Sequence, residues 1–202
     1  MKKVILYIHG KGGSFKEAQQ YQKNCIGFDI VGVDYHDYLP WIVENQIKME
    51  YQKLRKEYES IFIIANSIGA YFAMYALQNE DIQKALFISP IVDMEKLILD
   101  MMQWANVTEK ELYEKEEIST EFGETLSWQY LKFAREHPIK WNVPTEILYA
   151  QKDNLTTFET VNNFVNKHNA RLTIMANGEH WFHTEEQLAF LDKWMKKELE
   201  ES

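Results

Sequence analysis

The sequence of 202 residues predicts an α/β protein with a doubly wound, mainly parallel sheet of six strands and a helical insertion. Short apolar runs alternate with longer helical patterns along almost the whole chain, as in a parallel sheet that helices cover on both faces. This alternation stops between Pro90 and Trp141, where only helical patterns rich in Met and aromatic residues occur. No linker rich in Gly, Pro or Ser divides the chain. We therefore expect a single domain, 1–202, with an insertion over about 91–140.

Six short runs rich in β-branched and aromatic residues are predicted to be strands. They span 4–8, 30–34, 61–65, 84–89, 145–150 and 171–175. The N-terminal run, in "MKKVILYIHG", is too short for a secretion signal and has His9 and Gly10 where a cleavage site would need small residues. It is interpreted as the first core strand.

Apolar residues at helical spacing predict three helices. One begins at Pro40, since proline suits a first helical turn, and its apolar face holds Ile47, Tyr51, Leu54 and Tyr58. The last begins with Thr184, which forms a capping box with Gln187, and its apolar face holds Leu188, Leu191, Trp194 and Met195. The segment after Ser67 is apolar nearly all round, so this helix is expected to be central and buried.

Composition excludes some classes of function. The formal net charge of −9, without a basic stripe, opposes binding to nucleic acid. No stretch approaches the roughly 20 apolar residues of a membrane span. The single cysteine, Cys25, permits no internal disulfide and favours a reducing, cytoplasmic location. The sequons at Asn106 and Asn154 then carry no glycan, since glycosylation requires secretion. The oligomeric state is left open.

Ser67 stands in "IIANSIG", residues 63–69, between a predicted strand and a predicted helix. A sharp strand-to-helix turn needs small residues two before and two after its centre, and Ala65 and Gly69 meet this need. The free N–H groups at the start of the helix favour a developing negative charge beside the serine. Two interpretations stay open for the motif alone: Ser67 is a nucleophile, or it caps the helix that follows.

The first strand ends in "HGKGGS", His9 to Ser14. Its glycines permit a tight turn beside a ligand and expose backbone N–H groups, so the loop could form half of an oxyanion hole. Phosphate binding is the alternative, but Gly10, Gly12 and Gly13 match neither dinucleotide-binding nor P-loop spacing. His9 itself is expected to be structural.

Asp153 and His180 follow the last two predicted strands. The carboxyl ends of the strands line the ligand crevice of an open α/β sheet, so both side chains could meet Ser67 there. An imidazole could accept the serine proton, and a carboxylate could orient that imidazole. The alternatives are a turn aspartate and a packed loop histidine, with His183 as a rival base. Glu179, His180 and His183 lack the spacing of a helical zinc motif and an evident third ligand, so no metal is expected.

Taken together, these motifs resemble the α/β-hydrolase superfamily, and in particular its small, compact serine hydrolases. The matching residues are His9-Gly10-x-Gly12-Gly13-Ser14, Ala65-x-Ser67-x-Gly69, Asp153 and Gly178-x-His180, in the superfamily's order of Ser, Asp and His. The resemblance implies that Ser67 is the nucleophile, His180 the base and Asp153 the acid. It also implies that backbone N–H groups of Lys11 and Ile68 stabilise the oxyanion.

The chain departs from the superfamily pattern in three places. Ala65 replaces the first glycine of the elbow, and Ala150 stands where glycine is usual before the acid. The first two strands of the superfamily are expected to be absent, since the predicted strand bearing the His-Gly motif begins almost at Met1.

The implied activity is cleavage of a carboxylic ester or related acyl bond of a small, hydrophobic substrate through an acyl-enzyme, without a metal or organic cofactor. The insertion would form a cap, with candidate pocket residues Met101, Met102, Trp104, Phe122 and Trp128, although packing onto the core would also explain them. Two other classes of function are compatible. One is a non-catalytic binding protein of the same fold. The other is a thioesterase, peptidase or acyltransferase that uses the same three side chains.

Overall fold

The computed structural model describes residues 2–200 and contains two compact units. The first unit comprises Met1–Val92 and Lys140–Ser202, and the second comprises Asp93–Ile139. The two units are described one after the other. In the described part of the chain, no helix combines the length and the apolar character that crossing a bilayer requires.

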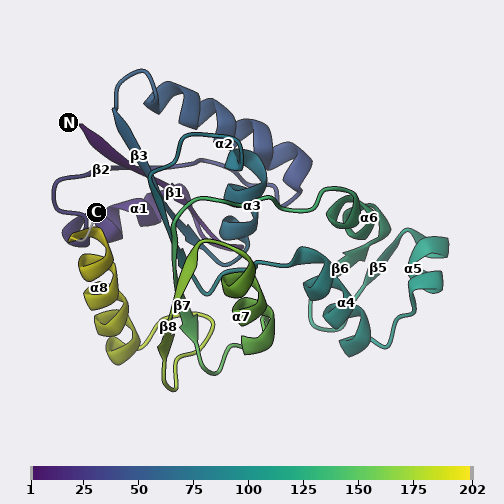
Figure 1. Ribbon diagram of the computed structural model, residues 1–202. Helices are drawn as coiled ribbons and strands as arrows, with labels where there is room; N and C mark the ends of the chain where they lie inside the picture. The colour runs from purple at the N-terminus through teal and green to yellow at the C-terminus, as the bar shows by residue number, and fades with distance from the viewer. Residues whose placement is uncertain (1, 201–202) are drawn as a thin grey trace. The chain divides into compact units, whose positions relative to one another are not determined.

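A six-stranded sheet forms the centre of the first unit (Figure 1). Its strands run in the spatial order β2-β1-β3-β4-β7-β8, and every neighbouring pair is parallel. All six strands predicted from the sequence are present. Their bounds are Lys3–Ile8 (β1), Asp29–Gly32 (β2), Ser60–Asn66 (β3), Lys84–Ile88 (β4), Thr145–Ala150 (β7) and Ala170–Met175 (β8).

Helices cover both faces of this sheet (Figure 1). One face carries α2 (Pro40–Leu54) and α3 (Ile68–Leu77), which pack against each other. The other carries α1 (Ala18–Tyr21), between the 3-10 turns η1 (Phe15–Glu17) and η2 (Gln22–Asn24), together with α8 (Glu185–Glu200). The seventh helix, α7 (Phe158–Lys167), packs against β8. The sheet is therefore doubly wound, as predicted.

The structure refines the predicted helices in detail. The first begins at Pro40 as expected but ends at Leu54, so Tyr58 lies outside it. At α8, Thr184 accepts a hydrogen bond from the Gln187 backbone at 3.2 Å. The side chain of Gln187 accepts from the backbone of His183 instead of Thr184, which leaves the predicted capping box half formed. Leu188 is 44% exposed although its spacing predicted an inward side chain, and it lines a pocket.

The order of the strands determines where a ligand can bind. The chain passes from β1 outward to β2, and then returns to the other side of β1 to form β3. A crevice forms outside the carboxyl ends of strands at such a topological switch point. The loops that contain His9 and Ser67 follow β1 and β3, whose last pairing joins Ile8 to Ala65. Both loops therefore start at the same point of the sheet edge.

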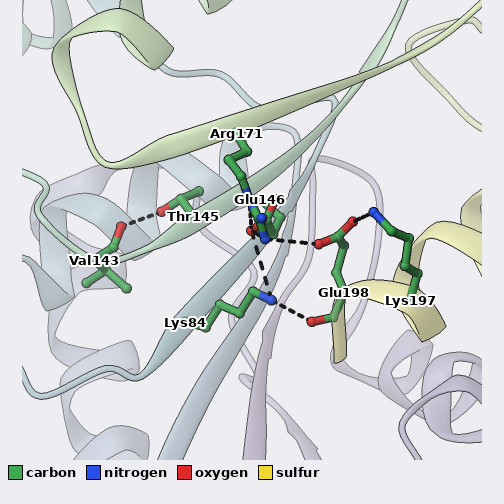
Figure 2. Close-up of polar contacts among 7 residues, drawn as sticks. All are labelled: Lys84, Val143, Thr145, Glu146, Arg171, Lys197 and Glu198. Carbon is green, nitrogen blue, oxygen red and sulfur yellow. Dashed lines mark hydrogen bonds and ion pairs between the residues drawn. The ribbon is translucent and has the colours of Figure 1, made fainter. Parts of the chain in front are cut away.

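The amino ends of β4, β7 and β8 carry a network of charged side chains (Figure 2). The amine of Lys84 donates to the backbone oxygen of Glu198 at 2.5 Å and lies 3.9 Å from the carboxylate of Glu146. Arg171 donates to the same carboxylate at 2.5 and 2.8 Å. Lys84, Glu146 and Glu198 are buried, whereas the side chain of Arg171 is exposed, and the network links three strands to the last helix.

The second unit contains three helices and a short β-hairpin. Its elements are α4 (Met94–Trp104), α5 (Glu109–Lys115), β5 (Glu117–Ser119), β6 (Thr125–Ser127) and α6 (Trp128–Glu136). Its buried side chains include Leu112, Leu126 and Leu131. Arg135 joins the helices through hydrogen bonds to Glu95 and Glu109, at 2.7 Å each.

The sequence predicted only helices in this segment, and that prediction was wrong for β5 and β6. The two strands pair antiparallel, and Gly123, with a φ of 87°, lies in the turn between them. Three-residue strands are too short to produce a recognisable alternation of apolar and polar residues. Trp104 and Phe122 pack edge to face, with ring centroids 6.1 Å apart. The expectation that this segment caps a substrate pocket stays a prediction.

Candidate active site

Ser67 occupies a strained turn between β3 and α3. Its φ of 51° and ψ of −121° are rare for a residue with a side chain, and cost of order 1–3 kcal/mol. Three backbone hydrogen bonds hold it there. Its N–H donates to Ile88 at 3.0 Å, and its carbonyl accepts from Ala70 and Ile91 at 3.1 and 3.0 Å. The hydroxyl does not cap α3, so the structure does not have the arrangement that the helix-cap interpretation requires.

Glycines permit the turn to approach β1 closely. A Cβ atom on Gly69 would lie 2.5 Å from the carbonyl oxygens of Ile8 and His9, which is far inside van der Waals contact. A Cβ atom on Gly10 would lie 3.3 Å from the Cβ of Ser67. The end of β1 and the glycine loop therefore lie directly beside the serine.

Ser67, His180 and Asp153 form one chain of hydrogen bonds, although 113 residues separate the serine from the histidine. The hydroxyl of Ser67 lies 2.9 Å from Nε2 of His180. Nδ1 of the same ring lies 2.7 Å from Oδ2 of Asp153. The Asp153 side chain is fully buried, whereas that of His180 is 14% exposed. The imidazole thus bridges a hydroxyl that lines a pocket and a carboxylate shielded from water.

Asp153 is fixed on both of its carboxylate oxygens. While Oδ2 faces His180, Oδ1 accepts from the backbone of Leu155 and Thr156 at 2.8 and 2.9 Å. The loops that bear the acid and the histidine are also joined, since the backbone of Lys152 donates to Gly178 at 2.8 Å. The two side chains therefore meet because β7 and β8 are neighbours in the sheet.

His183, the rival base, faces elsewhere. Its Nδ1 lies 2.7 Å from the carbonyl oxygen of Trp181, and its ring stacks on the indole of the same residue. Its Nε2 is 3.5 Å from Glu179. Across residues 2–200, no group of three or more His, Cys, Asp or Glu side chains has an arrangement that could hold a metal ion.

Tyr35 and Tyr38, in the segment after β2, hold the loop from His9 to Ser14 in place. His9 is buried, and its ring stacks on that of Tyr35 with centroids 3.9 Å apart. The hydroxyl of Tyr35 donates to the carbonyl of His9. The backbone of Gly12, at a φ of 77°, donates to the hydroxyl of Tyr38 at 3.0 Å. These contacts are those of a structural histidine, which is the role expected for His9. Sequence reasoning missed both tyrosines, although the aromatic residues of "DYHDY", residues 34–38, could have indicated a contact with the loop.

The two predicted oxyanion donors belong to different segments, Lys11 to the loop after β1 and Ile68 to the start of α3. Lys11 follows Gly10 in a turn that the backbone bond from Gly13 to Gly10 closes at 3.1 Å. Ile68 is the first residue of α3, at the end where backbone N–H groups have no acceptor within the helix.

A pocket of about 540 Å³ opens beside Ser67. One part of its wall is apolar and includes Ile88, Phe182, Leu188 and Leu191. Another part is polar and includes Glu17, Tyr21, Asn66, Lys23 and Asp192. Sequence reasoning missed this polar wall, because its members come from separate elements and match no motif.

Comparisons with known proteins agree on the fold. A model of the family described as Uncharacterised protein family (UPF0227) matches residues 4–190. Est1E from Butyrivibrio proteoclasticus superposes with a TM-score of 0.80 at 17% identity, covering 99% of this chain and 88% of Est1E. Est1E with ferulic acid bound gives a TM-score of 0.74 at 16% identity, covering 98% and 88%.

Mouse alpha/beta hydrolase domain-containing protein 10 superposes with a TM-score of 0.76 at 15% identity, covering 98% of this chain and 90% of that protein. No curated protein matches the sequence. At these identities the likeness concerns the fold. The chain has the α/β-hydrolase fold, as its motifs predicted.

Proposed function

The chain belongs to Uncharacterised protein family UPF0227, whose name states no activity, and we propose that it is a serine hydrolase that cleaves carboxylic esters. The proposal rests on one observation: the hydroxyl of Ser67, the ring of His180 and the buried carboxylate of Asp153 are linked by hydrogen bonds of 2.9 and 2.7 Å. A binding protein has no need for a hydroxyl, an imidazole and a carboxylate linked in this order beside a pocket. Nucleophilic catalysis needs each of them.

In the proposed reaction, Ser67 Oγ attacks the ester carbonyl carbon while Nε2 of His180 accepts the hydroxyl proton. The carbonyl electron pair moves to oxygen, and it returns to expel the alcohol, which takes the proton from His180. Water then attacks the acyl-enzyme with the same base and releases the carboxylic acid and Ser67. Asp153 holds the imidazole in the tautomer with Nδ1 protonated and stabilises its cation.

We propose the backbone N–H groups of Lys11 and Ile68 as the donors that stabilise the oxyanion. The closeness of Gly10 to Ser67 and the position of Ile68 at the start of α3 support this assignment. Each donor in such a hole is typically worth about 3 kcal/mol of transition-state stabilisation.

The apolar part of the pocket wall supports a small substrate with a hydrophobic arm. The ferulic acid bound to Est1E is a carboxylic acid, the kind of product that ester hydrolysis releases. The single cysteine, Cys25, is buried, and burial raises the pKa of its thiol to about 12. A lone, unreactive thiol of this kind supports a reducing, cytoplasmic setting.

Hydrolysis of p-nitrophenyl butyrate tests the proposal. We expect turnover by the wild type and loss of turnover in Ser67→Ala. Ser14→Ala is the matched control, since Ser14 lies in the neighbouring loop and its side chain does not cap the following 3-10 turn. Equal turnover by the wild type and a folded Ser67→Ala protein would refute the assignment.

A further inference from the structure

Two carboxylates line the pocket beside Ser67, and only one of them is neutralised. Asp192 pairs with the amine of Lys23 at 2.5 Å and accepts from the side chain of Asn24 at 2.6 Å. Glu17 accepts a hydrogen bond from the neutral hydroxyl of Tyr7 at 2.6 Å. Within residues 2–200, Glu17 has no lysine or arginine as an ion-pair partner. Glu17 is therefore the carboxylate in this pocket that can still bind a cation.

Glu17 is held close to the reacting centre. A Cβ atom on Gly13 would lie 2.9 Å from both carboxylate oxygens of Glu17. The backbone N–H of Gly13 donates a hydrogen bond to the carbonyl oxygen of Gly10 and so closes a single turn. A Cβ atom on Gly10 would lie 3.3 Å from the Cβ of Ser67. One tight turn thus separates the nucleophile from this carboxylate. Ser67 and Glu17 also line the same pocket, so a molecule bound there can contact both.

A second route of contacts joins Glu17 to the residue before the nucleophile. The side-chain nitrogen of Asn66 donates to the hydroxyls of Tyr7 and Tyr21 at 2.9 and 3.0 Å, and Tyr7 in turn donates to Glu17. Burial, with Tyr21 and Glu17 nearby, raises the pKa of Tyr7 well above its ordinary value, so its hydroxyl stays a donor. The network therefore holds the Glu17 carboxylate through hydroxyl and amide groups that carry no charge.

The polar groups left over in this wall are hydrogen-bond acceptors. The oxygen Oδ1 of Asn66 is buried and has no hydrogen-bond partner among the described residues. The bond from Tyr7 engages Oε2 of Glu17, and Glu17 lines the pocket. A buried acceptor without a donor costs about 1–3 kcal/mol, so a ligand that supplies a donor gains affinity here.

We propose that Glu17 is a specificity-determining residue, which selects substrates carrying a hydrogen-bond donor, an ammonium or hydroxyl group, on the arm that enters this pocket. The inference rests on the proposed function for what happens to the substrate, and it concerns binding as well as turnover. The apolar residues Ile88, Phe182 and Leu191 hold the chain of that arm, and Glu17 with Asn66 receives its end.

Binding tests the pocket independently of catalysis. NMR titrations of the wild type would compare butylammonium, butanol and butyl methyl ether, which share an apolar chain and differ in the donor. We expect butylammonium or butanol to bind about tenfold to a hundredfold more tightly than the ether, as for hydrogen bonds to charged groups. Preference for the ammonium identifies a cation as the ligand, and equal preference for both donors identifies a neutral hydroxyl as sufficient.

Two variants separate the role of Glu17 from a structural one. Glu17→Gln keeps an acceptor for Tyr7 but removes the charge, so the preference for the ammonium should disappear while the urea midpoint stays close to the wild type. Asp192→Asn removes the carboxylate that Lys23 already neutralises, so the preference should remain. Three results would overturn the proposal: equal affinities for all three probes in the wild type, a preference for the ammonium over butanol that is unchanged in Glu17→Gln, or a preference for the two donors over the ether that is unchanged in Glu17→Leu, which has no acceptor.

Turnover distinguishes this proposal from the proposed function. We expect kcat/KM to be higher for p-nitrophenyl ω-aminohexanoate or ω-hydroxyhexanoate than for the hexanoate, and the ratio to fall towards one in Glu17→Leu, which has no acceptor. Hydrolysis of all three esters at equal kcat/KM, with equal probe affinities, refutes the specificity and leaves the hydrolase standing. Donor-selective binding without hydrolysis of any ester refutes the hydrolase and leaves the role of Glu17 standing.

Discussion

At the scale of single residues, the candidate site combines a strained serine with an imidazole whose orientation is fixed. Ser67 keeps its rare backbone conformation because three backbone hydrogen bonds and the close approach to β1 determine it from all sides. The imidazole of His180 is fixed by Asp153, whose other oxygen is held by two backbone N–H groups. The orientation of the reacting atoms therefore does not depend on a substrate.

The choice between the two histidines gives a direct prediction. His180→Ala should lower kcat by about 10⁴-fold or more, because the proton of Ser67 then has no acceptor. His183→Ala should change kcat by less than about tenfold, since its ring contacts Trp181 and Glu179 instead of the serine. Steady-state kinetics with p-nitrophenyl butyrate measure both. A larger loss in His183→Ala than in His180→Ala would contradict the assignment of the base.

The glycine of the elbow gives a second prediction. Gly69→Ala should lower the free energy of unfolding by about 1–3 kcal/mol, because its Cβ would lie 2.5 Å from two backbone oxygens that cannot move away cheaply. Gly178→Ala is the matched control, with its nearest neighbours at 3.2 Å, and should cost less. Urea denaturation measures both, and equal costs would show that the strand and helix can separate without penalty.

At the scale of elements, ion pairs and caps organise the second unit. Thr108 and Glu111 form a full capping box at the start of α5, and Asp93 caps α4. Arg135 on α6 donates to Glu95 on α4 and to Glu109 on α5, so that one side chain joins three helices. Hydrogen bonds from Arg135 lower the pKa of Glu109.

This ion-pair cluster predicts a pH dependence. A carboxyl with a lowered folded pKa stabilises the fold above its unfolded pKa, and this contribution is lost as pH falls through the folded pKa. Arg135→Leu should therefore speed amide hydrogen exchange in Glu109–Lys115 at neutral pH, and the difference from the wild type should shrink below about pH 4. Lys132→Leu, which removes an exposed pair 3.8 Å long in the same helix, should change little. A pH-independent effect of Arg135→Leu would point to lost packing instead.

The elements that the sequence revealed are those whose signal is local. Buried parallel strands appear as continuous apolar runs, so all six could be located, and Ser67, Asp153 and His180 could be placed at strand ends. Tyr38 and Glu17 could not be placed beside the site, because the contacts that put them there join separate elements and match no motif. The strands β5 and β6 escaped detection because three residues carry no periodicity.

At the scale of the whole molecule, the two edges of the sheet have different tasks. The carboxyl edge carries the serine, the histidine and the glycine loop, and the amino edge carries the buried charges of Lys84, Glu146 and Glu198 (Figure 2). Ordinary burial of a charge is costly, and each of these charges is compensated within the network. The contact between Lys84 and Glu198 thereby joins the last helix, α8, to β4.

This division predicts that stability and catalysis can be changed separately. Lys84→Met should lower the free energy of unfolding by about 1–3 kcal/mol, because the buried backbone oxygen of Glu198 loses its donor and Glu146 loses one of its two cations. Arg171→Met should cost less, since the Arg171 side chain is 67% exposed. In both variants, kcat of the folded protein should equal that of the wild type. Urea denaturation and ester hydrolysis measure the two properties, and a selective loss of kcat would contradict the division.

The most direct test of the central claim, that Ser67 is a catalytic nucleophile, is reaction with a fluorophosphonate probe followed by mass spectrometry of the peptides. The wild type should gain one phosphonyl group on the peptide that contains Ser67, and Ser67→Ala should gain none. Labelling that persists in Ser67→Ala, or a folded wild type that does not react, would contradict the assignment.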